Sequence, residues 1–217
     1  LYYGGTFDPF HNAHLAIACG VRDALGAVVH LVPAADPPHR APPGASAQDR
    51  AAMVALGIAG QPGLKLECME LERAQRAPER PSWTVDTLAE LRQRMGPEVP
   101  LAWLIGGDSL DGLMRWHRWQ QLFDLAHIVV VARPGNPLPA VLPAALAACV
   151  AGGQWAASDW VQQQPAGGLL AVAQPLRGES STAVRAAIAA GQDISGWVQP
   201  PVAAYLAQRR LYGFHAG

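Results

Sequence analysis

The sequence is poor in cysteine and contains no cysteine pair. Its 217 residues include three cysteines, Cys19, Cys68 and Cys149, and none forms a CxxC motif with another. Structural zinc sites use paired cysteine or histidine ligands, and disulfide frameworks use an even number of cysteines. We therefore expect neither a zinc ribbon nor a disulfide scaffold, and we interpret the cysteines as reduced thiols.

Long apolar runs and an excess of charge are also missing. No stretch approaches the roughly 20 apolar residues that span a bilayer, and the formal net charge is −1. Non-specific nucleic-acid binding needs a sustained basic field, which this charge does not provide. We expect no export signal before the first apolar run. We expect a cytoplasmic protein with neither membrane nor nucleic acid as partner, whose acidic small-molecule substrates would be held by local groups.

Two common phosphate-binding motifs and the usual covalent catalysts are absent as well. The chain has neither the GxxxxGK[ST] loop nor the GxGxxG fingerprint. It also offers no Ser-His-Asp or Cys-His arrangement, so no enzyme nucleophile is indicated. Any phosphate chemistry must therefore use a different loop.

Strand and helix signals alternate along the chain, and 50% of its residues are hydrophobic, enough to bury a core in a single domain over residues 1–217. The patterns predict strands at 1–3, 27–33, 64–69, 101–107, 127–135 and 169–173. They predict helices at 14–25, 47–60, 82–95, 181–190 and after Pro201, with Ser82 or Thr84 capping the third. Proline-rich 34–46 and charged 70–81 are expected to be loops, and 136–167 gives no clear pattern. Alternation without repeats predicts an α/β fold with a doubly wound, Rossmann-like parallel sheet and a C-terminal helical end.

Ligands of such sheets bind beyond the carboxyl ends of the strands. Polar or glycine-rich segments follow the strands at four places: GGTFDPFHNAH (4–14), GGDS (106–109), ARPG (132–135) and ESSTAVR (179–185). Because the carboxyl ends of parallel strands share one edge, these segments predict a common site.

The first of these segments combines glycines with two histidines. Gly4 and Gly5 let backbone amides approach a phosphate, and His11 and His14 lie three apart at a predicted helix start. A helix N-terminus attracts anions, and an imidazole there can hydrogen-bond a phosphate whose charge grows during reaction. Two alternatives stay open: the histidines cap the helix or fill the core, or they bind a metal, although no third ligand is nearby.

Two later segments suit the same purpose. Asp108 at a helix start is either an N-cap or an acceptor for ribose hydroxyls. Ser181 and Thr182 at the last strand-to-helix junction, with Arg185 one turn further on, predict a phosphate clamp. Serine and threonine are also ordinary helix caps.

The four segments, in this order and at these distances, resemble the nucleotidyltransferases with an HxGH signature, and most closely the bacterial nicotinate-nucleotide adenylyltransferases. Further resembling blocks cover nearly the whole chain except 136–167: PPHR (37–40), SWTVDTL (82–88), WHRWQQL (116–122) and YLAQRRLYG (205–213). Two positions depart from the family pattern. Ala13 replaces the glycine of HxGH, and Arg40 stands where lysine is frequent.

The resemblance implies a reaction. These enzymes join ATP and nicotinic acid mononucleotide into nicotinic acid adenine dinucleotide and pyrophosphate, in NAD biosynthesis. The mononucleotide phosphate attacks the α-phosphorus of ATP, and Mg²⁺ arrives with ATP. The implied protein contribution is positioning and charge stabilisation.

The resemblance also implies roles for particular residues. His11, His14 and Arg185 would be catalytic. The ATP site would comprise Gly5, Thr6, Phe7, His11, His14, Arg40, Gly106, Asp108, Ser181, Thr182 and Arg185. The mononucleotide site would comprise Trp83, Thr84, Trp116 and His117, with Trp116 stacking on the pyridine ring unless it is a core residue.

Rival functions remain. Phosphopantetheine adenylyltransferase shares the first and last blocks but lacks the segments at 82–88 and 116–119. A preference for nicotinamide mononucleotide would depend on backbone N–H groups that a sequence does not display. A nucleotide-sensing module without activity is the third alternative, and a homo-oligomer is left open.

Overall fold

The computed structural model describes residues 1–35, 43–132, 137–174 and 178–214. Within these residues six strands form one sheet: β1 (Tyr2–Gly5), β2 (Val29–Pro33), β3 (Leu64–Leu66), β4 (Ala102–Gly106), β5 (His127–Val131) and β6 (Leu169–Val172). Their order is β3-β2-β1-β4-β5-β6, and the pairings β2–β3, β1–β4, β4–β5 and β5–β6 are parallel. This is the strand order of a doubly wound, Rossmann-like sheet, so the predicted fold class is confirmed.

Contacts divide the chain into two compact units. Unit 1 comprises Leu1–Tyr3 and Trp83–Leu176, and unit 2 comprises Gly4–Ser82 and Arg177–Gly217. The organisation of the whole chain as a single domain stays a prediction. In the described part of the chain, no helix is long and apolar enough to span a bilayer.

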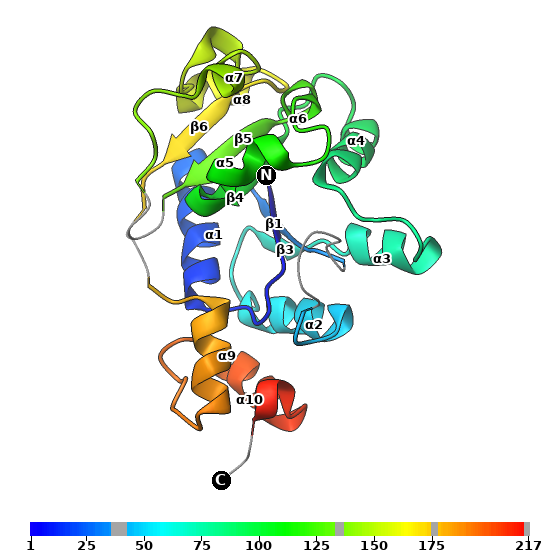
Figure 1. Cartoon of the computed structure of the whole chain (residues 1–217), viewed down its shortest axis with the longest axis vertical. Coiled ribbons are helices and arrows are strands. Elements are labelled where there is room, and N and C mark those ends of the chain that lie inside the picture. Colours follow the sequence, from blue (N-terminus) through cyan, green and yellow to red (C-terminus); the bar gives the residue numbers. More distant parts are fainter. Residues whose placement is uncertain (36–42, 133–136, 175–177, 215–217) are drawn as a thin grey trace. The chain divides into compact units, whose positions relative to one another are not determined.

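Unit 1 is built on β4, β5 and β6, which run side by side (Figure 1). Every residue of β5 is buried, as in a central parallel strand. The α-helices of this unit are α4 (Thr84–Met95), α5 (Gly107–Gly112), α6 (Gln121–Leu125), α7 (Ala144–Ala147) and α8 (Ser158–Gln163). Short 3₁₀ turns are η1 (Leu113–Arg115) and η2 (Ala151–Gly153). The segment without a sequence pattern, 136–167, thus supplies α7, η2 and α8.

Unit 2 contains the turn that follows β1 and the C-terminal helices. Its α-helices are α1 (Asn12–Leu25), α2 (Ala47–Gly57), α3 (Met69–Arg76), α9 (Ser181–Ala189) and α10 (Pro200–Gln208), followed by η3 (Leu211–Gly213). Figure 1 shows α9 and α10 in orange and red near the end of the chain. Asp49 of α2 accepts hydrogen bonds from Tyr205 Oη at 2.8 Å and Arg209 Nε at 3.1 Å. These bonds tie the C-terminal helical end to α2.

The loop expected over 70–81 is wrong for its first half, because α3 occupies Met69–Arg76. Its buried apolar residues, Met69 and Leu71, lie at the start, so no apolar periodicity develops. The helix is marked instead by charge. Acidic residues occupy its first turn and basic residues its last, which suits the helix dipole.

Other boundaries also differ from expectation. The N-cap of α4 is Trp83, rather than Ser82 or Thr84. Ser82 instead accepts a hydrogen bond from Arg73 at 2.8 Å, and Thr84 is the first residue of the helix. The strand expected over 127–135 ends at Val131, and residues 133–136 lie outside the described residues. Gly191, expected to stop α9, follows the C-cap Ala190 with a φ of 67°.

A buried histidine holds the start of β5. His127 is fully buried; its Nε2 lies 2.8 Å from the Gln164 carbonyl, and its Nδ1 accepts the Gly168 N–H at 2.9 Å. These bonds require the neutral ring with its proton on Nε2. Burial lowers the pKa of His127, with the Arg92 charge acting in the same direction and the Gln164 bond opposing them.

This pKa shift predicts a loss of stability in acid. The unfolded chain binds a proton near pH 6.5, whereas folded His127 resists it to a lower pH. Stability from His127 is therefore complete above pH 6.5 and falls by up to about 1.4 kcal/mol per pH unit below it. Urea unfolding of wild type and His127→Gln between pH 8 and 5 measures the effect. The variant should be less stable than wild type at pH 8, but its free energy of unfolding should change less with pH. An equal pH dependence in both proteins would contradict the assignment.

Candidate functional site

The turn after β1 leads directly into α1 in unit 2. Phe7 in this turn has a φ of 52°, in the left-handed region that non-glycine residues seldom adopt. The N-cap of α1 is His11, in extended backbone conformation, and His14 is the third residue of the helix. Asn12 fixes the helix start, because its backbone N–H donates to Trp197 O at 2.8 Å and its side chain donates to Gly196 O at 3.0 Å.

The two histidines contact each other, as their spacing predicts. Their ring centroids lie 3.7 Å apart with an interplanar angle of 24°. The His11 N–H donates to His14 Nδ1 at 3.3 Å, so the neutral His14 ring carries its proton on Nε2. That nitrogen can then act only as a hydrogen-bond donor.

Aromatic rings complete the surroundings of His14. Phe10 stacks on it with centroids 5.5 Å apart, and Phe7 meets it edge-on at 5.0 Å. His11 and His14 are only 3% and 8% exposed. In the structure, the contacts of His11 and His14 are therefore those expected of residues that cap a helix and fill the core. These contacts are compatible with catalysis, since the same packing fixes the orientation of a donor.

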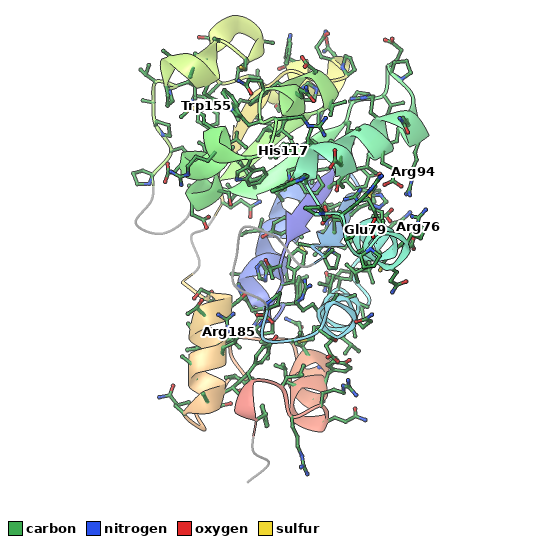
Figure 2. All side chains as sticks on the ribbon, turned by 45° about the vertical axis from the view of Figure 1, so that its right-hand side comes forward. Arg76, Glu79, Arg94, His117, Trp155 and Arg185 are labelled. Atoms are coloured by element: carbon green, nitrogen blue, oxygen red, sulfur yellow. The ribbon has the colours of Figure 1, made fainter. Side chains whose placement is uncertain are left out.

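The amino end of α9 lies against this turn within the same unit. Ser180 is the N-cap and accepts the Ala183 N–H at 3.1 Å. Ser181 Oγ donates to Pro9 O at 3.1 Å. Arg185, labelled in Figure 2, donates from Nη1 to Asp8 O at 2.6 Å and from Nη2 to Thr182 Oγ1 at 3.4 Å. The structure thus brings the predicted clamp residues to the histidine turn.

The sequence does not predict the role of Asp8, which lies at the centre of this arrangement. Asp8 is 6% exposed, and its carboxylate accepts the Gly44 and Ala45 N–H groups at 2.8 and 3.1 Å. Tyr212 Oη donates to the same carboxylate at 2.6 Å, and Arg185 Nη1 lies 3.5 Å from it. Asp-Pro is a turn signal in the sequence, but nothing local indicates partners so distant along the chain.

Arg50 of α2 is a second residue that the sequence does not single out. Its side chain is 0% exposed, and Nη1 donates to Thr6 O at 2.8 Å and to Ala34 O at 2.7 Å. These carbonyls follow β1 and β2. A buried guanidinium therefore fixes the turn that leads to the histidines and places positive charge beside it.

Six further predicted site residues belong to unit 1. Gly106 is the N-cap of α5 and Asp108 lies in its first turn. The Trp83 and His117 rings stack with centroids 4.9 Å apart. Trp116 is partly exposed at the end of η1. The structure thus brings together Trp83 and His117 of the predicted mononucleotide site.

An ion pair lies beside this stack. Asp86 in the first turn of α4 pairs with Arg118, the residue that follows His117. Arg40 of the predicted ATP site lies outside the described residues. Among the residues that the structure describes, no group of three or more His, Cys, Asp or Glu side chains is placed to hold a metal ion.

The chain is similar in sequence to several known proteins. A family model described as cytidylyltransferase-like matches residues 2–187. A Stenotrophomonas maltophilia protein named "Probable nicotinate-nucleotide adenylyltransferase" is 54% identical over 213 residues, covering 98% of this chain and 96% of the relative. A Xylella fastidiosa protein of the same name is 43% identical over 216 residues, covering 99% of this chain and 96% of the relative.

Solved structures share the fold. Plasmodium falciparum nicotinic acid mononucleotide adenylyltransferase complexed with NaAD superposes with a TM-score of 0.73 at 15% identity, covering 99% of this chain and 97% of that one. The same enzyme complexed with APC gives a TM-score of 0.69 at 16% identity, with coverages of 99% and 96%.

Proposed function

The chain belongs to the cytidylyltransferase-like family and, within it, to the nicotinate-nucleotide adenylyltransferases, and from this membership we propose that it joins ATP and nicotinic acid mononucleotide. The products are nicotinic acid adenine dinucleotide and pyrophosphate, a step in NAD biosynthesis. The names of the full-length relatives support the choice of substrates. The observation that carries the chemistry is the convergence of His11, His14 and Arg185 on the turn after β1, all within unit 2.

The reaction is a displacement at phosphorus. An oxygen of the mononucleotide phosphate forms a bond to the α-phosphorus of ATP, while the bond from that phosphorus to the bridging oxygen breaks and pyrophosphate leaves. Negative charge grows on the leaving group, and Mg²⁺ bound to the substrate ATP would help to neutralise it. The protein supplies donors that are already oriented.

Unit 2 provides those donors in this proposal. His14 Nε2–H, fixed as a donor by the His11 N–H on the opposite nitrogen, and His11 beside it would contact the α- and β-phosphates. The N-terminus of α1 adds the favourable end of its dipole. Gly5, Thr6 and Phe7 would line the nucleotide by backbone contacts. Ser181, Thr182, Arg185 and Arg40 would hold the triphosphate.

Further groups are proposed for adenosine and the acceptor. Gly106 and Asp108 would hold the adenosine part. Trp116 would stack on the pyridine ring, and backbone amides around Trp83, Thr84 and His117 would take the nicotinate carboxylate. We also propose that the enzyme acts in the cytoplasm, an expectation that its low cysteine content supports.

The proposed function is tested by pyrophosphate release from ATP with different acceptors. We expect rapid release with nicotinic acid mononucleotide, and much slower release with nicotinamide mononucleotide or phosphopantetheine. Faster turnover with either of the latter would transfer the assignment to that acceptor. ATP binding without release in the presence of any acceptor would favour a nucleotide-sensing module.

A further inference from the structure

We propose that Asp8 and Tyr212 are positioning residues for Arg185, so that the end of the chain helps to build the ATP site. The inference rests on the proposed function, in which Arg185 grips the triphosphate. It is carried by hydrogen bonds and one ion pair that join the turn after β1, the segment before α2, α9 and η3 at one buried carboxylate. All of these segments belong to unit 2.

The first step concerns the charge of Asp8. A carboxylate close to a triphosphate would repel it unless its own charge were balanced. Two backbone N–H groups, at Gly44 and Ala45, the Tyr212 hydroxyl and the Arg185 guanidinium surround the Asp8 carboxylate. Asp8 therefore serves as an internal anchor whose oxygens point at protein donors.

The second step concerns Arg185. Its Nη1 is held by Asp8 O at 2.6 Å and lies 3.5 Å from the carboxylate, whereas Nη2 makes a longer bond of 3.4 Å to Thr182. The side chain remains 35% exposed. One edge of the guanidinium is thus anchored and the other is more weakly held. An arginine oriented in this way loses less side-chain freedom when its other edge binds a phosphate.

The third step concerns Tyr212. Its hydroxyl lies 2.6 Å from Asp8 Oδ1, and its ring packs so closely on Gly44 that a Cβ there would be 2.9 Å from Cε1. The backbone φ values of Arg210 and Tyr212 are 51° and 58°. Residues other than glycine adopt such values only when the surrounding structure constrains them. Burial, followed by the bond to Asp8, raises the pKa of Tyr212 well above its usual range, so the hydroxyl keeps its proton.

The chain offers a matched control. Tyr205 Oη donates to Asp49 at 2.8 Å, and Asp49, like Asp8, is 6% exposed. Tyr212→Phe and Tyr205→Phe therefore each remove one tyrosine–carboxylate hydrogen bond near the C-terminus. In the network of Asp49, the arginine partner is Arg209 rather than a predicted phosphate ligand.

Steady-state kinetics of the two variants, with melting temperatures, test the proposal. Tyr212→Phe should lower kcat/KM for ATP about tenfold, mainly through KM, because a hydrogen bond to a charged group is lost. Its KM for the mononucleotide should stay within about twofold of wild type. Tyr205→Phe should lower the melting temperature while its ATP kinetics stay unchanged. Equal ATP kinetics in the two variants would overturn the proposal.

A double-mutant cycle shows whether Tyr212 acts through Arg185. The loss in the Tyr212→Phe/Arg185→Lys double variant should be well below the product of the single losses. Fully multiplicative losses would overturn the proposal.

Should Tyr212→Phe not fold, Gly44→Ala displaces the Tyr212 ring without removing a donor, and the same ATP-specific loss is expected. Calorimetric titration with ATP alone separates the failure of this inference from the failure of the proposed function. Weaker ATP binding in Tyr212→Phe than in wild type supports the positioning of Arg185 by Asp8 and Tyr212 even if wild type does not turn over.

Discussion

Alanine in place of His14 is expected to lower kcat for pyrophosphate release by about 10²–10³, because an oriented donor to developing charge is worth about 3–4 kcal/mol. The His14 ring is fixed by His11, Phe10 and Phe7, so the donor needs little reorganisation during the reaction. The binding of the mononucleotide should change much less than kcat. Steady-state turnover at saturating substrates measures the effect.

Two further variants distinguish catalysis from capping. In His14→Asn, the amide oxygen is short enough to accept the His11 N–H as Nδ1 does now, but the donor at Nε2 is lost. In His14→Gln, a side-chain amide N–H extends toward the position of Nε2, while the cap acceptor is lost. We expect His14→Asn to be the more stable of the two variants and His14→Gln to be the more active. Near-normal kcat in the alanine or asparagine variant would contradict a catalytic role for His14.

Much of the fold could be predicted because it depends on local pattern. The apolar runs of β4 and β5 and the alternation of strands with helices predict a parallel sheet, and the strand order bears this out. The helix α3 could not be predicted from apolar periodicity, because Met69 and Leu71 are its buried apolar residues and both lie in the first turn.

Some contacts of the candidate site could likewise be predicted from the sequence, and others could not. The spacing of His11 and His14 predicts their contact, since residues three apart share a helix face. The rule that strands present their carboxyl ends at one edge predicts that Arg185 meets the first turn. The partners of Asp8 lie 36 residues away at Gly44 and 204 away at Tyr212. No periodicity carries information over such separations.

Arg50 gives the clearest case of a residue that only the folded chain reveals. In the sequence it is one arginine within a predicted helix, where a solvent-exposed position is the usual expectation. In the structure it is buried and donates to the carbonyls of Thr6 and Ala34, at the ends of two neighbouring strands. Its removal would leave both carbonyls without this donor.

Arg50→Met should therefore lower the free energy of unfolding by about 2–6 kcal/mol, since each of the two partly buried carbonyls that loses its donor costs about 1–3 kcal/mol. Because Thr6 belongs to the turn that would line ATP, KM for ATP should also rise, and Arg50→Lys should recover part of both losses by reaching one carbonyl. Arg92→Met is the control: Arg92 donates to the Leu125 and Pro165 carbonyls in unit 1, at 2.7 Å each. That variant should lose stability while its KM for ATP is unchanged, as urea unfolding and ATP kinetics at 25 °C would show. If the two methionine variants shared the same ATP kinetics, Arg50 would stabilise the fold without shaping the nucleotide turn.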